Sequence, residues 1–351
     1  MRAGNQRTET LVNEYKKAGV DIALADQVKN KIKLLVASTR TPAVLADVGA
    51  FGGMMSFPKD FKNPVLVATT DGVGTKLKVA IAAKRLDTVG EDLVNHSVND
   101  LLVQGAAPLF FMDYQAWGKL DAAAAEVLME GLVRGCKKHN CPVLGGETAE
   151  MPGFYAEGEF DLAGFMVGIV EKTKILDGRS IVPGDALIGF ASSGLHTNGY
   201  SLARRALLDS GLYRLDSFLP DNGTTLADEL LRVHRSYFHL LHPLILQEKL
   251  NGLAHITGGG IPGNLVRILP YETSAVVNTS NWEAPPIFKL IQKAGEVKKE
   301  EMYQVFNMGI GMIAAVAKDK LEEVVRDLKG MNEKFWVIGE IAAGKKEVVL
   351  Q

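Results

Sequence analysis

The sequence predicts an α/β fold of the α+β type, divided into two domains. Short segments typical of strands are interspersed with longer segments of helical periodicity, which favours a mixed architecture over a pure sandwich or bundle. The chain has 351 residues, and a common domain size is about 150 residues. Hydrophobic residues make up 47% of the chain and charged residues 23%, as in folded proteins rather than disordered ones.

The amino-terminal elements follow from periodicity and turn residues. Residues 1–60 are polar or glycine-rich with only a weak helical period, so we expect a partly mobile arm and a loop there. The segment PVLVAT, which begins at Pro64, predicts a buried strand that ends in the turn residues of TTDGVGTK. Thr88 and Glu91 have the spacing of a capping box, which predicts a helix from about Leu86 to Gln104.

The following segments alternate until a polar stretch interrupts them. Strands are predicted over GAAPLFFMDYQAW, PVLGGETAE and FDLAGFMVGIVE, and a helix capped by Asp121 lies between the first two. The stretch EKTKILDGRSIVPGD is rich in turn formers, which places a domain boundary near Glu171. The predicted domains are therefore 1–170 and 171–351.

The carboxy-terminal half repeats this pattern. The segment ALIGFAS predicts a strand, followed by the loop SGLHTNG and a helix that runs to about Leu208. An amphipathic helix is predicted from Leu226 to about Leu246, with Pro243 ending or kinking it. Further strands are predicted over FNMGIGMIAAVA and FWVIGEI.

Charge and cysteine content exclude several classes of protein. The 39 basic and 41 acidic residues give a formal charge of −2, and no basic tract indicates a nucleic-acid partner. No apolar run is long enough to span a bilayer, so no membrane partner is expected. The chain has only two cysteines, and we expect a reduced, cytoplasmic protein.

The segment TTDGVGTK combines the groups that hold a metal-bound phosphate. Glycine N–H groups can face phosphate oxygens, Lys76 can offset their charge, and Asp71 can bind Mg²⁺. The alternative is a plain turn between two elements. The pattern GxxxxGK[ST] occurs nowhere in the chain, which argues against a P-loop NTPase.

Two further acids favour a magnesium site. Asp100 lies near the end of a predicted helix, and Glu147 follows a strand and a glycine pair. Asp100 alone could equally be an ordinary surface acid. Three carboxylates without paired Cys or His at zinc spacing favour Mg²⁺ over a transition metal. The segment CKKHNC offers only three zinc ligands at a helix end, so we interpret it as structural.

Two glycine-containing loops are candidates for anion binding. The loop SSGLHTNG carries His196, Thr197 and Asn198 directly before a predicted helix, whose exposed N–H groups attract anions. An equally good explanation of Thr197 and Asn198 is that one of them caps the helix. The segment HITGGGIPGN has GxGxxG spacing, but its late position and internal proline argue against a dinucleotide fold. Its glycines still suit an anion cradle.

Seven segments together closely resemble the phosphoribosylformylglycinamidine cyclo-ligase family, also called AIR synthetases. They are YKKAGVDI, TTDGVGTK, VNDLLVQGAAPLFFMDY, VLGGETAEMPGFY, SSGLHTNGYSLAR, HITGGGIPGN and FNMGIGM, and they occur in the family's order. The resemblance covers nearly the whole chain. It implies a two-domain AIR-synthetase-like fold, in which the mixed amino-terminal sheet pairs across a homodimer and an α/β domain follows.

The resemblance also implies the reaction. Formylglycinamidine ribonucleotide and ATP would give aminoimidazole ribonucleotide, ADP and phosphate through an iminophosphate. ATP and Mg²⁺ are the implied cofactors, with K⁺ as a further candidate, and the ribonucleotide is the implied small-molecule partner. The alternatives are sister enzymes of the same superfamily, such as the glutamine-dependent synthetase one step earlier, thiamine-phosphate kinase or selenophosphate synthetase. A non-catalytic maturation scaffold is an alternative from another class.

The resemblance assigns candidate roles to individual residues. The metal ligands would be Asp71, Asp100 and Glu147, and the catalytic candidates are Lys76, His196 and Asp100. The expected nucleotide- and phosphate-binding residues are Lys33, Phe51, Gly52, Gly53, Asp71, Gly72, Gly74, Thr75, Asn99, Gly146, Glu147, Thr197, Asn198, Gly258, Gly259 and Gly260. One departure is His96, which stands where the family pattern leads us to expect an apolar residue. It lies four residues before Asp100 on a predicted helix, so both side chains can share one face.

Overall fold

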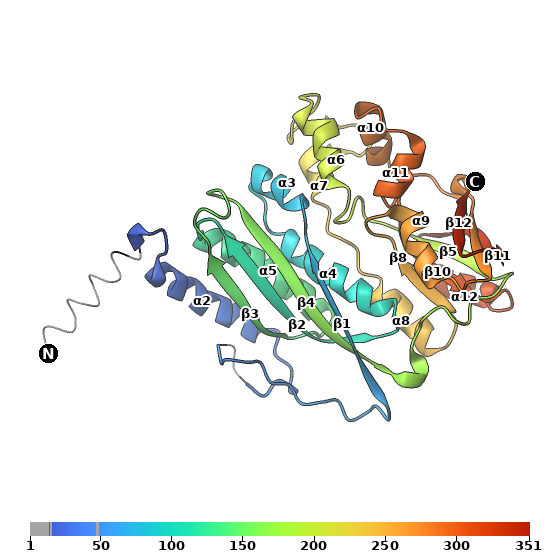
Figure 1. Ribbon diagram of the computed structural model, residues 1–351, viewed down its shortest axis with the longest axis horizontal. Helices are drawn as coiled ribbons and strands as arrows, with labels where there is room; N and C mark the ends of the chain where they lie inside the picture. The colour runs from blue at the N-terminus through green and yellow to red at the C-terminus, as the bar shows by residue number, and fades with distance from the viewer. Residues whose placement is uncertain (1–13, 15, 47–48) are drawn as a thin grey trace, which may run out of the picture.

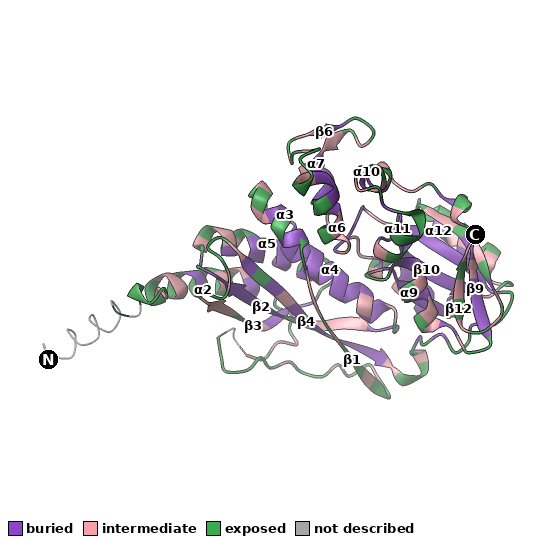
Figure 2. Ribbon diagram, turned by 45° about the horizontal axis from the view of Figure 1, so that its top comes forward, coloured by how far each residue is buried: buried purple, intermediate pink, exposed green. Residues whose placement is uncertain are grey.

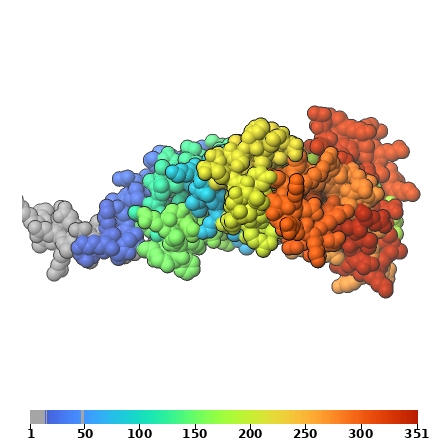
Figure 3. Space-filling model, turned by 90° about the horizontal axis from the view of Figure 1, so that it is seen from above, coloured from blue at the N-terminus to red at the C-terminus, as the bar shows by residue number. Residues whose placement is uncertain are grey.

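The chain forms two sheets, each accompanied by helices, along an elongated molecule. The computed structural model describes residues 14, 16–46 and 49–351. The amino-terminal sheet and the carboxy-terminal sheet lie at opposite ends, and the long axis follows the order of the sequence (Figures 1 and 3). The predicted α/β class of the α+β type is confirmed, because both sheets mix parallel and antiparallel pairs.

The amino-terminal sheet has the strand order β1-β4-β2-β3. Its strands are β1 (Pro64–Gly72), β2 (Ala107–Trp117), β3 (Val143–Glu150) and β4 (Phe160–Glu171). The strands β2 and β3 are parallel because the crossover helix α5 (Ala122–Lys138) joins them, whereas β4 pairs antiparallel with both β1 and β2. The strands expected from the sequence are present, and Asp71 is the penultimate residue of β1 as expected. The prediction that β1 is buried is wrong, because β1 is the edge strand of the sheet and none of its residues is fully buried.

Helix α4 (Val89–Leu102) is the central element of the molecule. It packs on the amino-terminal sheet and on α5, and its other side meets α8 and β8 of the carboxy-terminal half. Figure 2 shows that it is buried along almost its whole length. A Cβ on Gly90 would lie 2.3 Å from the carbonyl oxygen of Leu128, so α4 and α5 can approach this closely only because residue 90 is glycine. The side chains of α4 are therefore shared between both halves.

Two expectations about the amino-terminal half are corrected. Part of the expected arm is a regular helix, α2 (Ile22–Ala37), which buries Val28 and Val36 and packs against α5. Residues 1–13, 15, 47 and 48 lie outside the described part of the chain. Thr88 is the N-cap of α4 but makes no capping bond, because Glu91 is held by Arg134 and Lys138 instead. The predicted capping box is therefore absent.

The carboxy-terminal sheet has the order β12-β9-β11-β5-β10-β8. Its strands are β5 (Ala186–Ala191), β8 (Gly252–His255), β9 (Thr273–Val277), β10 (Ile310–Val316), β11 (Phe335–Ala343) and β12 (Glu347–Leu350), and β6 (Phe218–Leu219) and β7 (Thr224–Thr225) form a separate hairpin. The remaining helices are α3 (Lys76–Ala83), α6 (Tyr200–Arg204), α7 (Leu226–Leu230), α8 (Phe238–Leu246), α9 (Gly260–Leu265), α10 (Pro286–Ala294), α11 (Lys299–Val305) and α12 (Leu321–Gly330). Strand β10 lies between β5 and β8 and is buried along its whole length.

The predicted single helix over 226–246 is wrong. It is two helices, α7 and α8, joined by a non-helical segment that carries His234 and Arg235 across α4. Pro243 lies inside α8 rather than at its end. Asp92 accepts a hydrogen bond from the His234 N–H, and Asn99 accepts one from the Tyr237 N–H and donates one to the carbonyl of Arg235. These bonds to the backbone of the segment outweigh its helical periodicity. Within the described residues, no helix combines the length and apolarity needed to cross a bilayer.

Candidate active site

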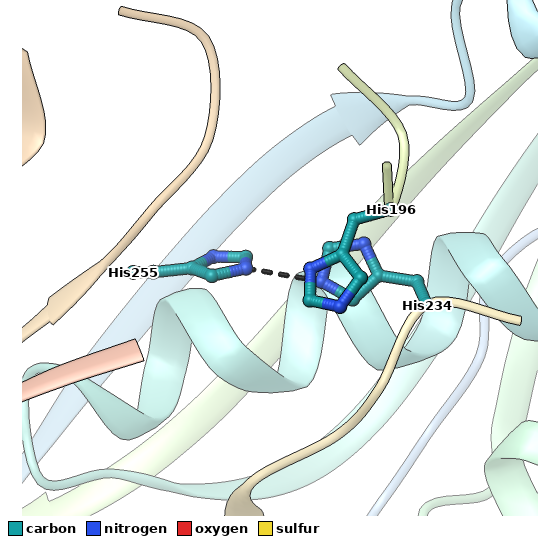
Figure 4. A group of neighbouring side chains, drawn as sticks. All are labelled: His196, His234 and His255. Carbon is teal, nitrogen blue, oxygen red and sulfur yellow. Dashed lines mark hydrogen bonds between the residues drawn. The ribbon is translucent and has the colours of Figure 1, made fainter. Parts of the chain in front are cut away.

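Four histidines from four different segments meet where the two halves of the chain join. His96 comes from α4, His196 from the loop after β5, His234 from the segment between α7 and α8, and His255 from the end of β8. We call these four residues the histidine cluster. Each side chain is almost fully buried, and Figure 4 shows the rings of His196, His234 and His255 close together. The rings of His196 and His234 are stacked with their centroids 4.0 Å apart.

Two carboxylates lie at the accessible edge of this cluster. Asp71 Oδ2 is 2.6 Å from His96 Nε2, and Asp100 Oδ1 is 2.8 Å from His255 Nδ1. The second oxygen of Asp100 is 3.8 Å from His96 Nε2. The side chains of Asp71 and Asp100 are 39% and 28% exposed, so this edge can be reached by a ligand. The structure thus brings together two of the expected metal ligands.

The electrostatics of the cluster depend on burial and on these two carboxylates. Burial lowers the pKa of both His196 and His234 well below the ordinary value, so both imidazoles are neutral near pH 7. Burial also opposes charge on His96, but the bond to Asp71 and the charge of Asp100 leave its pKa raised. Burial by itself raises the pKa of Asp71 and Asp100, and the adjacent histidines reverse this and lower both pKa values.

His196 has a strained backbone conformation, and a glycine beside it leaves room for its ring. Its φ angle is +62°, a left-handed conformation that residues other than glycine seldom adopt. A Cβ on Gly311 would lie 2.5 Å from His196 Cε1, so this glycine of the FNMGIGM segment leaves room for the ring. Asn307 of the same segment accepts a hydrogen bond from Ser192 Oγ and donates one to the carbonyl of Gly194. Two sequence segments, the loop after β5 and FNMGIGM, therefore fix the position of this imidazole.

The two glycine-containing loops also meet. A Cβ on Gly258 would be 3.2 Å from Asn198 Oδ1, so the backbone around Gly258, Gly259 and Gly260 lies against the loop that carries His196, Thr197 and Asn198. The Asn198 amide nitrogen is buried without a hydrogen-bond partner. Thr75 Oγ1 lies 3.0 Å from Ser201 Oγ, which links the DGVGTK turn to helix α6 directly after this loop. The unpartnered amide of Asn198 is therefore available to an anionic ligand between these loops.

Lys76 does not occupy the expected position. Its side chain is fully buried, with Nζ 2.7 Å from Asp92 Oδ2 and donating to the carbonyl of Arg232 at 2.7 Å. Burial lowers the pKa of Lys76, against the attraction of Asp92. Both partners hold Nζ away from the surface of the turn. In this structure Lys76 links α3, α4 and the carboxy-terminal half, and it does not present its charge to a phosphate.

Glu147 lies in a separate pocket. Across the four strands, Asp71 pairs with Gly164, Gly164 with Asp113, and Asp113 with Gly146. Three strand spacings of about 4.8 Å separate Asp71 from Gly146 by about 14 Å. Because Glu147 is the next residue along β3, its side chain points to the opposite face of the sheet. Within one chain, the structure does not bring Glu147 to Asp71 and Asp100.

This separate pocket has a volume of about 530 Å³ and gathers the other expected nucleotide neighbours. Its lining includes Lys33, Phe51, Gly52, Gly53, Gly146 and Glu147. It also contains Asp113, whose pKa is raised from 3.8 to about 6 by burial. Asp113 accepts a hydrogen bond from Gln115 and has no cationic partner among its recorded contacts in the described part of the chain.

Several site residues were not found by sequence reasoning. His255 lies just before the glycines of HITGGG. Its place in this motif could have indicated a site residue, but only the glycines of the segment were considered. His234 had no signal because it lies in a segment predicted to be helical. Asn99, expected near the nucleotide, uses both ends of its amide within the protein, on Tyr237, Arg235 and His234. Cys136 and Cys141 are buried free thiols, and His139 bonds to Asn95.

Comparisons with known proteins agree with this two-part architecture. Residues 47–170 match the family model "AIR synthase related protein, N-terminal domain", and residues 182–351 match the corresponding C-terminal domain model. The chain is 51% identical over 333 residues to a phosphoribosylformylglycinamidine cyclo-ligase of Trichlorobacter lovleyi, covering 95% of each chain. It is 52% identical over 334 residues to the same enzyme of Myxococcus xanthus, covering 95% of this chain and 97% of the relative.

Solved structures share the fold at low sequence identity. A thiamine-monophosphate kinase from Stenotrophomonas maltophilia superposes with a TM-score of 0.66 at 17% identity, covering 95% of this chain and 96% of the other. A hydrogenase maturation protein in complex with ATP gives a TM-score of 0.62 at 15% identity, covering 90% and 88%. At such identities the likeness concerns the fold alone.

Proposed function

The chain belongs to the phosphoribosylformylglycinamidine cyclo-ligase family, and on this premise we propose that it closes the imidazole ring of aminoimidazole ribonucleotide. The reaction consumes formylglycinamidine ribonucleotide and ATP and releases ADP and phosphate. The observation that carries the proposal is the identity of about half of all residues with curated cyclo-ligases over nearly the full length. The sister enzymes and the maturation scaffold match only in fold.

The chemistry requires that a formamide oxygen become a leaving group. ATP supplies a phosphoryl group that converts this oxygen into an iminophosphate, and attack by an amidine nitrogen on the same carbon then expels phosphate. The new ring must also lose protons. The protein therefore has to screen phosphate charge, hold nucleophile and carbon in near-attack geometry, and accept a proton.

We assign these tasks to the junction between the two domains. Asp71 and Asp100 are the ligands for the divalent cation of ATP, expected to be Mg²⁺, since they are the acids at the accessible edge of the cluster. His196 is the candidate for contact with the reacting oxygens: Ser193 N–H donates to its Nε2, so the neutral ring carries its proton on Nδ1, which is buried without an acceptor. Thr75, Asn198 and the backbone of 258–260 are the phosphate neighbours.

The 530 Å³ pocket is the proposed place of the nucleotide base and ribose. Lys33, Gly53 and Glu147 line this pocket. Lys76 is not among its lining residues, because its side chain is buried against Asp92. We assign Lys76 the role of a positioning residue, since its ion pair with Asp92 fixes α4 against the carboxy-terminal half.

We also propose a homodimer that pairs through the open face of the amino-terminal sheet. Thr70, Phe165 and Met112 occupy facing positions on β1, β4 and β2, and Leu66 lies further along the same face. Phe165, Met112 and Leu66 are exposed in the single chain. Such an apolar sheet face is typical of a subunit interface. We place the enzyme in the cytoplasm, where its two buried thiols would stay reduced.

The test is a turnover assay with formylglycinamidine ribonucleotide, ATP and Mg²⁺, with and without K⁺. ADP and aminoimidazole ribonucleotide should appear in equal amounts. ADP release without imidazole, or turnover only with a different acceptor, would reject the proposed reaction.

A further inference from the structure

We propose that His139 and Asn95 are positioning residues for the ring of His196. His139 is the C-cap residue of α5 and belongs to the segment CKKHNC, which has no part in the candidate active site. The inference deepens the proposed function and rests on it for the role of His196. It follows from the direction of two hydrogen bonds that connect α5 and α4 with the backbone of His234.

Asn95 joins α4 to the segment between α7 and α8. Its Nδ2 donates to the carbonyl oxygen of His234 at 2.7 Å. A backbone carbonyl can only accept, so this end of the side chain is the NH₂ group and Oδ1 is the acceptor. Three residues earlier on α4, Asp92 accepts a hydrogen bond from the N–H of His234 at 2.6 Å. Helix α4 therefore holds both backbone polar groups of His234.

His139 fixes the orientation of the Asn95 amide. Its Nε2 lies 3.1 Å from Asn95 Oδ1. Because Oδ1 accepts, the imidazole carries its proton on Nε2 and donates it. With the proton on Nδ1 instead, Asn95 would have to turn its NH₂ group toward His139 and set Oδ1 against the carbonyl of His234, where two acceptors repel each other. The network therefore has one consistent arrangement, which runs from His139 through Asn95 to His234.

The surroundings of His139 keep it in this state. Its side chain is almost fully buried, and burial lowers its pKa to about 4, so the ring is neutral near pH 7 and carries one proton. Its Nδ1 is buried without a hydrogen-bond partner among the described residues. The ring of His239 on α8 stacks on it, with centroids 5.1 Å apart and planes inclined by 10°. His239 is itself held by a bond of 2.7 Å to the carbonyl of Lys138.

The position of His234 determines that of His196. Their rings are stacked with centroids 4.0 Å apart and planes inclined by 23°, so neither ring can tilt without displacing the other (Figure 4). The N–H of Ser193 donates to His196 Nε2 at 3.2 Å, which leaves the Nδ1–H for the reacting groups. A shift of the His234 backbone would change the direction of this N–H. The path that begins at His139 therefore ends at the ring of His196.

Removing the donor at residue 139 should release the Asn95 amide. Asn95 Oδ1 would then be buried without a donor, and an unsatisfied buried polar group is costly. The amide can lower this cost only by rotating, which breaks its bond to the carbonyl of His234. Glutamine carries an N–H donor at nearly the position of the imidazole Nε2, whereas leucine has a similar volume and no donor. The two replacements therefore separate the hydrogen bond from the packing.

The test compares His139→Leu with His139→Gln in the full-length protein, assayed with formylglycinamidine ribonucleotide, ATP and Mg²⁺. His139→Leu should lower kcat about tenfold or more, since small misplacements of a reacting group cost this much, and should change the KM of ATP less than about twofold. His139→Gln should stay close to the parental kcat. The matched control is His242→Leu, which changes a half-buried histidine of α8 that stacks on Phe238 and should turn over like the parent.

A second measurement reports the geometry without turnover. Long-range ¹H–¹⁵N correlation spectra should show His139 as the Nε2–H tautomer. The ring resonances of His196, which the stacked ring of His234 shifts, should move in His139→Leu but not in His139→Gln.

Four results would overturn the proposal. They are an Nδ1–H tautomer for His139, unchanged His196 resonances in His139→Leu, a parental kcat for His139→Leu with only lower thermal stability, and an equal loss of kcat in His139→Leu and His139→Gln. Absence of cyclisation by the parent, with the spectra as expected, would instead reject the proposed function.

Discussion

At the domain junction, charged carboxylates lie next to histidine side chains that are almost fully buried. Asp71 is partly exposed, lies next to His96 and accepts a hydrogen bond from the Gly72 N–H. His196, by contrast, is buried, neutral and backbone-strained, and its Nδ1–H lacks an acceptor, which suits a group that donates a hydrogen bond to a reacting oxygen without reorienting. We therefore assign cation binding to Asp71 and a hydrogen bond to the reacting groups to His196.

Replacing Asp71 should abolish most turnover without unfolding the protein. Asp71→Asn removes one preorganised charge from the cation site, so we expect kcat to fall about 100-fold or more. Steady-state assays with circular dichroism as a check on folding measure this. Asp161→Asn, which changes an exposed acid on β4, serves as the control. Near-normal turnover of Asp71→Asn would remove Asp71 from the site.

Asp113 should make stability depend on pH in an unusual direction. Its pKa is raised from 3.8 to about 6, so the folded chain binds more protons than the unfolded chain between these values. Stability is therefore lost as pH rises from about 4 to 6, by about 3 kcal/mol for about 2 pKa units. Asp113→Asn removes this loss. Urea midpoints of both proteins at pH 4 and pH 7 should diverge accordingly, and a pH-independent difference would contradict the assignment.

At the level of elements, helix α4 determines the geometry of the site. It supplies His96, Asn99 and Asp100 on one side while its glycine packs against α5. Its hydrogen bonds to the segment between α7 and α8 place His234 in the cluster. A shift of this helix would therefore displace the residues of both domains together.

Adding a methyl group at Gly90 should loosen this packing. Gly90→Ala forces α4 away from the backbone of Leu128 and Leu132, and we expect a loss of about 3 kcal/mol. Turnover should fall as well, because the ligands on α4 move. Gly330→Ala is the matched control, since nothing lies within 4 Å of its added Cβ at the end of α12. That control should be neutral or more stable by about 0.5 kcal/mol in thermal or urea unfolding.

The positions of the strands could be predicted from the sequence, whereas contacts between segments far apart in the chain could not. The local pattern is sufficient to locate β1, β2, β3 and β4 but not their burial, because β1 lies at the edge of the sheet without a buried residue. The break between α7 and α8 depends on Asp92 and Asn99, which are more than a hundred residues away in the chain. The same applies to Lys76, whose buried partner Asp92 no local pattern reveals. The motifs located Asp71, Asp100 and His196, and the departure from the family pattern located His96, but neither singled out His234 or His255.

For the whole molecule, the proposed dimer makes a direct prediction. Phe165→Glu places a charge in the middle of the open sheet face, next to Met112 and Thr70, and should give a monomer in light scattering. Tyr271→Glu changes an exposed aromatic residue of the carboxy-terminal half, away from this face, and should leave a dimer. A Phe165→Glu dimer of parental stability would place the interface elsewhere.

The central claim of the account is that phosphate leaves with the formyl oxygen of the substrate. Formylglycinamidine ribonucleotide labelled with ¹⁸O at that oxygen, incubated with ATP, a divalent metal and this protein, tests it directly. We predict one ¹⁸O atom in each inorganic phosphate released, with ADP and aminoimidazole ribonucleotide formed in equal amounts. Unlabelled phosphate, with the ¹⁸O retained in the substrate or lost to water, would contradict the account.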